Sequence, residues 1–151
     1  MKNVNNKINI RETYDLEHRD SIFFENCKNC YFIIPKKINK IIIYNCQNTR
    51  FEMNNVISSL EIVKCSELYV LIYGKLMTTQ LDFVKDSDFH YLYSNGFVIS
   101  CGTDNVRINT QYHNLILPYH MFLQQYITNI NTWIVKTREE CLDPEGYLLL
   151  E

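Results

Sequence analysis

Cysteine is the residue type in this chain whose side chain could most directly do chemistry, and the 151-residue sequence has six of them. Cys27, Cys46 and Cys65 are equally spaced along the sequence, and Cys27 and Cys30 form a single C-x-x-C pair. A structural zinc site needs four ligands, and no second pair has a matching spacing. Equal intervals instead place the three side chains one above another in a repeat structure. We therefore interpret them as an internal ladder of small, slightly polar groups.

Histidine, the other residue type suited to catalysis, occurs without a catalytic arrangement. There is no His-x-x-x-His spacing, no Ser/Cys/His signature and no glycine-rich loop that could cradle a phosphate. His90 falls in a predicted strand, where a packing or surface role is expected. The four histidines are His18, His90, His113 and His120. We predict no catalytic residues, no metal and no cofactor, and hence a protein that is not an enzyme.

Charge and hydropathy exclude two further classes of function. The formal net charge is −2 and no basic stripe is interleaved with aromatic residues, which argues against nucleic-acid binding. No apolar run approaches the roughly 20 residues that a membrane-spanning helix needs, so no membrane insertion is expected. Residues 1–6 have no apolar signal-peptide core. We therefore expect a cytoplasmic protein whose thiols stay reduced.

The residues around the three spaced cysteines repeat as well. Each copy has a strand-like segment, a corner of two or three residues that starts at the cysteine, and a second strand-like segment. The first segments are residues 22–27, 41–46 and 60–65, and the second are residues 30–34, 49–53 and 68–72. Two more copies follow in a looser register. In one, residues 80–86 lead to Phe89–Leu92 with Asp86 at the corner; in the other, residues 97–101 lead to residues 105–108.

Alternation within these segments predicts strands with one buried face, as where Leu60 and Ile62 flank Glu61. Strands this short cannot bury their apolar face alone, but stacked turns about 4.8 Å apart can. The sequence therefore predicts an all-β protein, a parallel β-helix of about five to six turns.

We expect residues 1–151 to form a single domain, with repeat turns over about 20–110 and a C-terminal segment over about 111–151. Before the repeat, Ile8, Ile10 and Tyr14 are expected to add a poorly formed first rung. After it, we expect one helical turn over residues 122–126 and strands at residues 132–137 and 147–150, separated by a turn at 143–146.

The order and spacing of several short motifs resemble the C-terminal domain of the cyclase-associated protein family over roughly residues 20–140. These motifs are Asn45-Cys46, Val56, Leu60-Glu61-Ile62, Val70, Gly74-Lys75 and Thr78. The family's Ser-Ser-Glu-x-Asn-Val segment is replaced by residues 103–106, one residue shorter, and the chain after Cys141 is longer than the family pattern. Short members of the family resemble this chain in holding only the last domain of the full-length protein.

The resemblance implies a right-handed β-helix with a C-terminal β-hairpin that is exchanged between two protomers. In such a homodimer, the interface would include Trp133, Ile134 and Val135. It also implies a partner, monomeric ADP-bound actin, on which the protein would promote nucleotide exchange and so regulate actin turnover. The expected location is cytoplasmic and associated with the cytoskeleton.

The residues that this resemblance favours for actin binding are charged or polar. They are Lys75, Asp104, Arg107, Thr137 and Glu139. Lys75 follows Gly74, for which we expect a turn conformation that requires glycine. Two alternatives remain. One is a GTPase-activating module like tubulin-folding cofactor C, which would present Arg50 or Arg107. The other is a β-helix that serves only as a scaffold.

Overall fold

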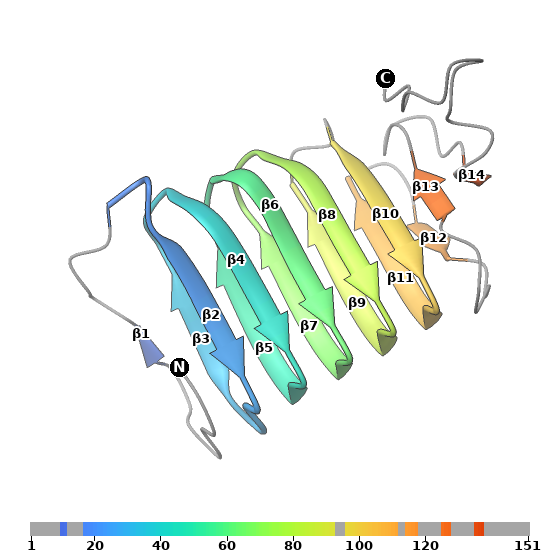
Figure 1. Cartoon of the computed structure of the whole chain (residues 1–151), viewed down its shortest axis with the longest axis horizontal. Helices are drawn as coiled ribbons and strands as arrows, with labels where there is room; N and C mark the ends of the chain where they lie inside the picture. The colour runs from blue at the N-terminus through green and yellow to red at the C-terminus, as the bar shows by residue number, and fades with distance from the viewer. Residues whose placement is uncertain are drawn as a thin grey trace.

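The computed structural model describes residues 10–11, 17–92, 96–111, 114–117, 125–127 and 135–137. In these residues every regular element is a β-strand, and the strands stack along the long axis of the molecule as a column of about five turns (Figure 1). The described residues contain no helix that is long and apolar enough to cross a membrane. The expected all-β parallel β-helix is confirmed.

Two sheets form the walls of the column, and each turn contributes one strand to each sheet. The first sheet contains β2 (Ser21–Glu25), β4 (Ile38–Tyr44), β6 (Val56–Val63), β8 (Leu76–Asp82) and β10 (Phe97–Cys101), followed by β13 (Gln125–Ile127) and β14 (Val135–Thr137). The second contains β1 (Ile10–Arg11), β3 (Tyr31–Ile34), β5 (Gln47–Met53), β7 (Ser66–Ile72), β9 (Lys85–Tyr91), β11 (Asp104–Thr110) and β12 (Asn114–Ile116).

The core lies between the two sheets and is built from the alternate residues of each strand. In β4, for example, Ile41 and Ile43 are fully buried while their neighbours are half-buried on the outer face. At the first turns, three phenylalanine rings fill the interior. Phe24 lies 4.7 Å from Phe32 and 5.0 Å from Phe51, measured between ring centroids. Branched apolar residues suit this environment because they pack well on a pleated surface.

One edge of the column repeats without variation, and we call it the constant edge. It consists of the corners from an even strand to the next odd strand, which in the later turns include the first two residues of that odd strand. The corners are residues 26–29, 45–48, 64–67, 83–86 and 102–105. The first and fourth residues of each corner have positive φ, and asparagine is frequent there because it tolerates this conformation. Asparagine side chains also bond from turn to turn, with Asn45 Nδ2 donating to Asn26 Oδ1 at 2.6 Å.

The looser register expected for the last two copies is wrong. The interval between paired residues stays the same as that between the cysteines, since Val63 pairs with Asp82 and Asp82 with Cys101. Val84 and Thr103 therefore occupy the corner position of the three cysteines, and both are buried. Cys101 instead lies at the end of a strand. The corner requires a small inward side chain, and valine and threonine meet that requirement without a thiol.

The opposite edge, which we call the variable edge, consists of the connections from an odd strand to the next even strand. Its described residues are 35–37, 54–55, 73–75, 92 and 96. Here the interval between paired residues changes: Ile38 pairs with Val56, whereas Val56 pairs with Leu76, a longer step along the sequence. Gly74 does not have the positive φ that its place in a turn suggested. Glycine is required there because any larger side chain would clash with the neighbouring connection: a Cβ would lie 2.6 Å from the backbone nitrogen of Asn55.

The two ends of the column differ from its middle. At the N-terminal end, Ile10 pairs with Phe32, which confirms the extra rung for this residue, whereas Ile8 and Tyr14 lie outside the described residues. At the C-terminal end, β13 pairs antiparallel with both β10 and β14, which confirms the hairpin. Gln125 and Tyr126 belong to β13, so the helical turn expected there is wrong. The strand expected at 147–150 lies outside the described residues.

Candidate protein-binding surface

The internal ladder expected for the spaced cysteines is confirmed. Cys27, Cys46 and Cys65 are buried in successive turns and form no disulfide. The backbone N–H of Cys27 donates to Sγ of Cys46 at 3.4 Å, and that of Cys46 donates to Sγ of Cys65 at 3.3 Å. The thiols thus satisfy backbone groups of the corners. Across the residues that the structure describes, no three His, Cys, Asp or Glu side chains are grouped to hold a metal ion.

Burial also makes the central thiol unreactive. The hydrogen bond with Cys27 acts to lower the pKa of Cys46, but the Cys65 thiol and burial outweigh it and raise that pKa to about 12. A thiol must ionise to act as a nucleophile or a metal ligand. The hydrogen bond with Cys46 lowers the pKa of Cys65, but both thiols are buried and accept hydrogen bonds from the backbone of the corners. The candidate site lies elsewhere on the surface.

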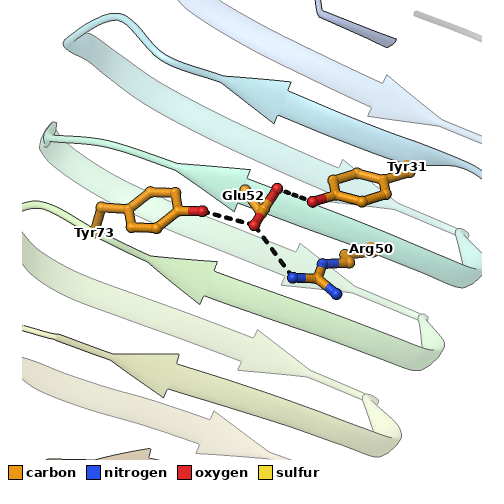
Figure 2. Close-up of polar contacts among 4 residues, drawn as sticks. All are labelled: Tyr31, Arg50, Glu52 and Tyr73. Carbon is orange, nitrogen blue, oxygen red and sulfur yellow. Dashed lines mark hydrogen bonds and ion pairs between the residues drawn. The ribbon is translucent and has the colours of Figure 1, made fainter. Parts of the chain in front are cut away.

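A polar network occupies the outer face of the second sheet. Arg50 and Glu52 lie two residues apart in β5, so both side chains point outward. Glu52 accepts hydrogen bonds from the hydroxyl groups of Tyr31, in β3, and Tyr73, just after β7; the latter is 2.6 Å long. Nη2 of Arg50 lies 3.2 Å from Oε1 of Glu52, and Figure 2 shows the three partners converging on this carboxylate.

The network fixes the charge of its members. Burial acts to raise the pKa of Glu52, but the hydrogen bonds from Tyr31, Tyr73 and Arg50 outweigh it and lower that pKa. The same bond to Glu52 raises the pKa of Tyr73 to about 12. Burial acts to lower the pKa of Arg50, yet Glu52 and the nearby tyrosines raise it. At neutral pH the network therefore holds the Glu52 carboxylate, the Arg50 guanidinium and a neutral Tyr73.

The network continues as a row across the sheet. The guanidinium carbon of Arg50 lies 4.9 Å from the ring centroid of Tyr31 and 4.6 Å from that of Tyr69. Strand register extends this row from Tyr69 to Asp88 and Arg107. Tyrosine and arginine are enriched in protein-binding surfaces, where they supply much of the binding energy. This flat outer face therefore has the composition of an interface.

A groove on the variable edge adjoins the network at Tyr73. Its lining combines the cations Lys37 and Lys75 with Ile57, Tyr73 and Met77, and none of the described residues that line it is acidic. It has a volume of about 540 Å³, within the usual range for binding sites. The constant edge has the opposite character. We count its charges from the last residue of each even strand to the fourth residue of the following corner. The basic residues there are Lys28, Lys64 and Lys85, and the acidic residues are Glu25, Glu67, Asp82, Asp86 and Asp104.

The residues expected to bind actin are not all brought together. Lys75 is exposed in the groove, and Arg107 is exposed in the row on the second sheet. Asp104 begins β11 at the constant edge, separated from Lys75 by the length of a strand such as β7. At about 3.3 Å per residue, that is roughly 20 Å. Thr137 and Val135 belong to β14, while Trp133, Ile134 and Glu139 lie outside the described residues.

The tyrosines and Glu52 are not among the site residues expected from the sequence, although the sequence contains a signal for the tyrosines. Tyr31, Arg50 and Tyr69 follow one another at the same interval as the three spaced cysteines, so they had to lie side by side in one sheet. His90, expected in a strand, lies in β9 with its ring 4.7 Å from that of Tyr69. Lys37 was also missed, because its proximity to Lys75 depends on the variable turns.

Comparison with protein families identifies the repeat. Residues 1–117 match a family model described as adenylate cyclase associated (CAP) C terminal. The matched region ends one residue after β12, so it contains the whole parallel column.

Individual proteins give the same result. The chain is 32% identical over 63 residues to the adenylyl cyclase-associated protein of Schizosaccharomyces pombe, covering 42% of this chain and 11% of that protein. It is 31% identical over 80 residues to the adenylyl cyclase-associated protein of Dictyostelium discoideum, covering 52% and 17%. The chain thus spans only a small part of these relatives. A crystal structure of cyclase-associated protein from Cryptosporidium parvum has the same fold, with a TM-score of 0.71, 22% identity, and coverage of 87% and 85%.

Proposed function

The chain belongs to the adenylate cyclase-associated (CAP) C-terminal family, and on this basis we propose that it binds monomeric, ADP-bound actin and promotes nucleotide exchange on it. The observation that carries the proposal is the family match over residues 1–117, which takes in the whole column rather than one motif. In this role the protein regulates actin turnover in the cytoplasm, at the cytoskeleton, and performs no chemistry of its own.

Exchange follows from selective binding. A partner shifts an equilibrium only by the difference between its affinities for two states. A protein that binds actin best in a state with a weakly held nucleotide would therefore speed the release of ADP. A hydrogen-bonded β-column suits this work because it loses little conformational entropy on docking.

The proposed contact surface combines the groove with the outer face of the second sheet. Lys75 supplies a cation in the groove, and Arg107 supplies one in the row of strands. Tyr73 joins the two regions, since it lines the groove and bonds to Glu52. Asp104, Thr137 and Glu139 enter the proposal through the family resemblance alone.

Dimerisation is the second part of the proposal. Exchange of the C-terminal hairpin through Trp133, Ile134 and Val135 would present two copies of the surface to two actin monomers. Light scattering tests it, because one chain has a mass of 18.1 kDa. The expected mass is twice that value, and a monomer at micromolar concentration would contradict strand exchange.

The alternative based on tubulin-folding cofactor C receives no specific support. A GTPase-activating arginine must reach the transferred phosphate. The Arg50 guanidinium instead bonds to Glu52 and lies between the rings of Tyr31 and Tyr69. Arg107 is exposed, so this restraint applies to Arg50 alone.

The direct test is a titration of fluorescently labelled ADP-actin monomers with the protein, followed by the release rate of a fluorescent nucleotide. We expect saturable binding in the micromolar range or tighter and faster release. Absence of binding at tens of micromolar would contradict the proposal, whereas binding without faster release would remove only the exchange activity.

A further inference from the structure

Tyr73 lines two hollows of the surface. The first is the groove of the variable edge, and the second, of about 750 Å³, is lined by Tyr73 together with residues 90–92 and 109–111. Tyr73 is 41% exposed, so a partner that covers both hollows would contact it. Tyrosine is one of the residue types that contribute most to binding energy at protein interfaces. The position of this one ring is therefore important for any partner at this surface.

The backbone of Tyr73 is held by the preceding turn. Its N–H donates to the carbonyl of Met53 at 2.8 Å. Leu92 occupies the same place one turn later, where its N–H donates to the carbonyl of Ile72 at 3.1 Å. A leucine has no polar group at its tip, whereas the hydroxyl group of Tyr73 provides a second point of attachment. Tyr73 can thus be held at both ends, and Leu92 only at its backbone.

The second point of attachment is the Glu52 carboxylate. The hydroxyl group of Tyr73 donates to its Oε1 at 2.6 Å. Glu52 is 6% exposed and also bonds to Tyr31 and Arg50, and Figure 2 shows the two tyrosines approaching it from opposite sides. Hydrogen bonds to an ionised acceptor are about twice as strong as those between neutral groups. A buried carboxylate with two other partners therefore fixes the position of the Tyr73 hydroxyl group.

A ring that is fixed before a partner arrives increases affinity. A side chain that becomes ordered only on binding loses conformational freedom at that moment, and one such side chain lowers affinity by about twofold to tenfold. Because Tyr73 is attached at its backbone and at its hydroxyl group, it has lost most of this freedom in the unbound protein. The bond to Glu52 therefore contributes to binding without touching the partner.

We propose that Glu52 is a positioning residue for partner binding: it holds the Tyr73 hydroxyl group, so that the ring is a fixed anchor between the groove and the second hollow. The partner contacts the ring of Tyr73 and not the carboxylate, because Glu52 is buried. This inference rests on the proposed binding of monomeric ADP-actin, and it assigns roles to Tyr73 and Glu52 that the family match does not supply.

A double-mutant cycle on the affinity for labelled ADP-actin monomers tests the proposal. Tyr73→Ala removes the anchor and should weaken binding at least about tenfold, and a smaller loss would overturn the anchor role. Tyr73→Phe keeps the ring but loses the bond to Glu52, so it should weaken binding about threefold in the native chain and not at all in the Glu52→Leu chain.

Two other outcomes of the cycle would overturn the positioning role. An equal loss for Tyr73→Phe in both chains would mean that the hydroxyl group contacts the partner directly. No loss in the native chain would mean that the bond to Glu52 does not affect binding.

Two control variants separate positioning from other effects. Glu52→Gln keeps a side-chain oxygen that can accept the hydrogen bond from Tyr73, so it should bind actin more tightly than Glu52→Leu. Equal affinities for these two variants would overturn the proposal. Tyr44→Phe removes a hydroxyl group from β4 of the first sheet, outside the proposed contact surface, and should bind normally. A loss as large as that of Tyr73→Phe would also overturn the proposal.

NMR relaxation of the tyrosine ring carbons tests the positioning without a partner. In a chain labelled with ¹³C at the tyrosine Cε atoms, the order parameter of Tyr73 should fall by about a third in Glu52→Leu, and that of Tyr44 should not change. An unchanged value for Tyr73 would overturn the positioning role. Failure of the native chain to bind actin would overturn the proposed function and the anchor role, but this measurement would still decide whether Glu52 holds the ring.

Discussion

The constant edge and the variable edge lie on opposite sides of one core, yet they differ in regularity, backbone conformation and charge. At the constant edge every corner has the same length and uses two residues with positive φ. At two of the corners, the backbone N–H of Cys27 and of Cys46 donates to a thiol of the next turn. At the variable edge the interval between paired residues changes from one turn to the next. The first edge is acidic on balance, and the second carries Lys36, Lys37 and Lys75.

This difference indicates that, in a repeat protein, the residues that maintain the fold can lie at one edge and the residues available for binding at the other. Where a side chain must occupy a left-handed position or fill a corner, few residue types are suitable. Where connections vary in length, the side chains face solvent and are available for contacts. We therefore expect substitutions at the constant edge to change stability, and substitutions at the variable edge to change binding.

The largest effect is expected in the core that both edges share. Phe51→Ala removes a fully buried ring that packs on Phe24 and Phe32, and it should lower the free energy of unfolding by about 3–5 kcal/mol. Urea denaturation followed by circular dichroism measures this loss. Met77→Ala on the variable edge is the matched control, because its exposed side chain should cost little. Similar losses in both variants would mean that the column does not pack as described.

A smaller effect distinguishes the two edges directly. Asn48 has a φ of 48° and donates to Asn29 Oδ1 at 2.6 Å, so Asn48→Ala should cost about 1–2 kcal/mol. Asn54, on the variable edge, makes one exposed hydrogen bond to the carbonyl of Pro35, and Asn54→Ala should cost at most about 0.5 kcal/mol. Equal losses in urea denaturation would remove the structural distinction between the edges.

The polar network gives a pH-dependent effect. Because folding lowers the pKa of Glu52 below its ordinary value of 4.5, the ionised carboxylate stabilises the folded state. This contribution is fully present above pH 4.5 and is lost as the pH falls through the folded pKa. Glu52→Gln should therefore be less stable than the native chain at pH 7, and the gap should narrow on acidification. A gap that widens in acid, measured by urea denaturation, would contradict the network.

The smallest effect on stability is expected for Lys75→Glu, within about 0.5 kcal/mol, because Lys75 is exposed. Its affinity for ADP-actin monomers should nevertheless fall about tenfold or more. Lys85→Glu, at the constant edge, is the matched control and should bind normally. Equal weakening by both variants would mean that total charge, rather than the groove, governs binding.

Much of the fold was predictable because the cysteines mark one corner position through three turns. The prediction failed at Val84 and Thr103, where a small buried residue replaces the cysteine. Because the residue type changes there, the sequence no longer showed that these residues occupy the same corner position. The candidate site was harder to predict. Arg50 and its tyrosines share the interval of the cysteines, but Lys37 and Lys75 meet only through turns of unequal length, which a strict repeat does not reveal.

Hydrogen exchange of the protein with and without saturating ADP-actin monomers tests the division of work between the edges most directly. The account predicts slower amide exchange at residues 54–57 and 73–77 in the complex, with residues 45–48 and 64–67 unchanged. Slower exchange confined to the constant edge, or no change anywhere at saturation, would contradict it.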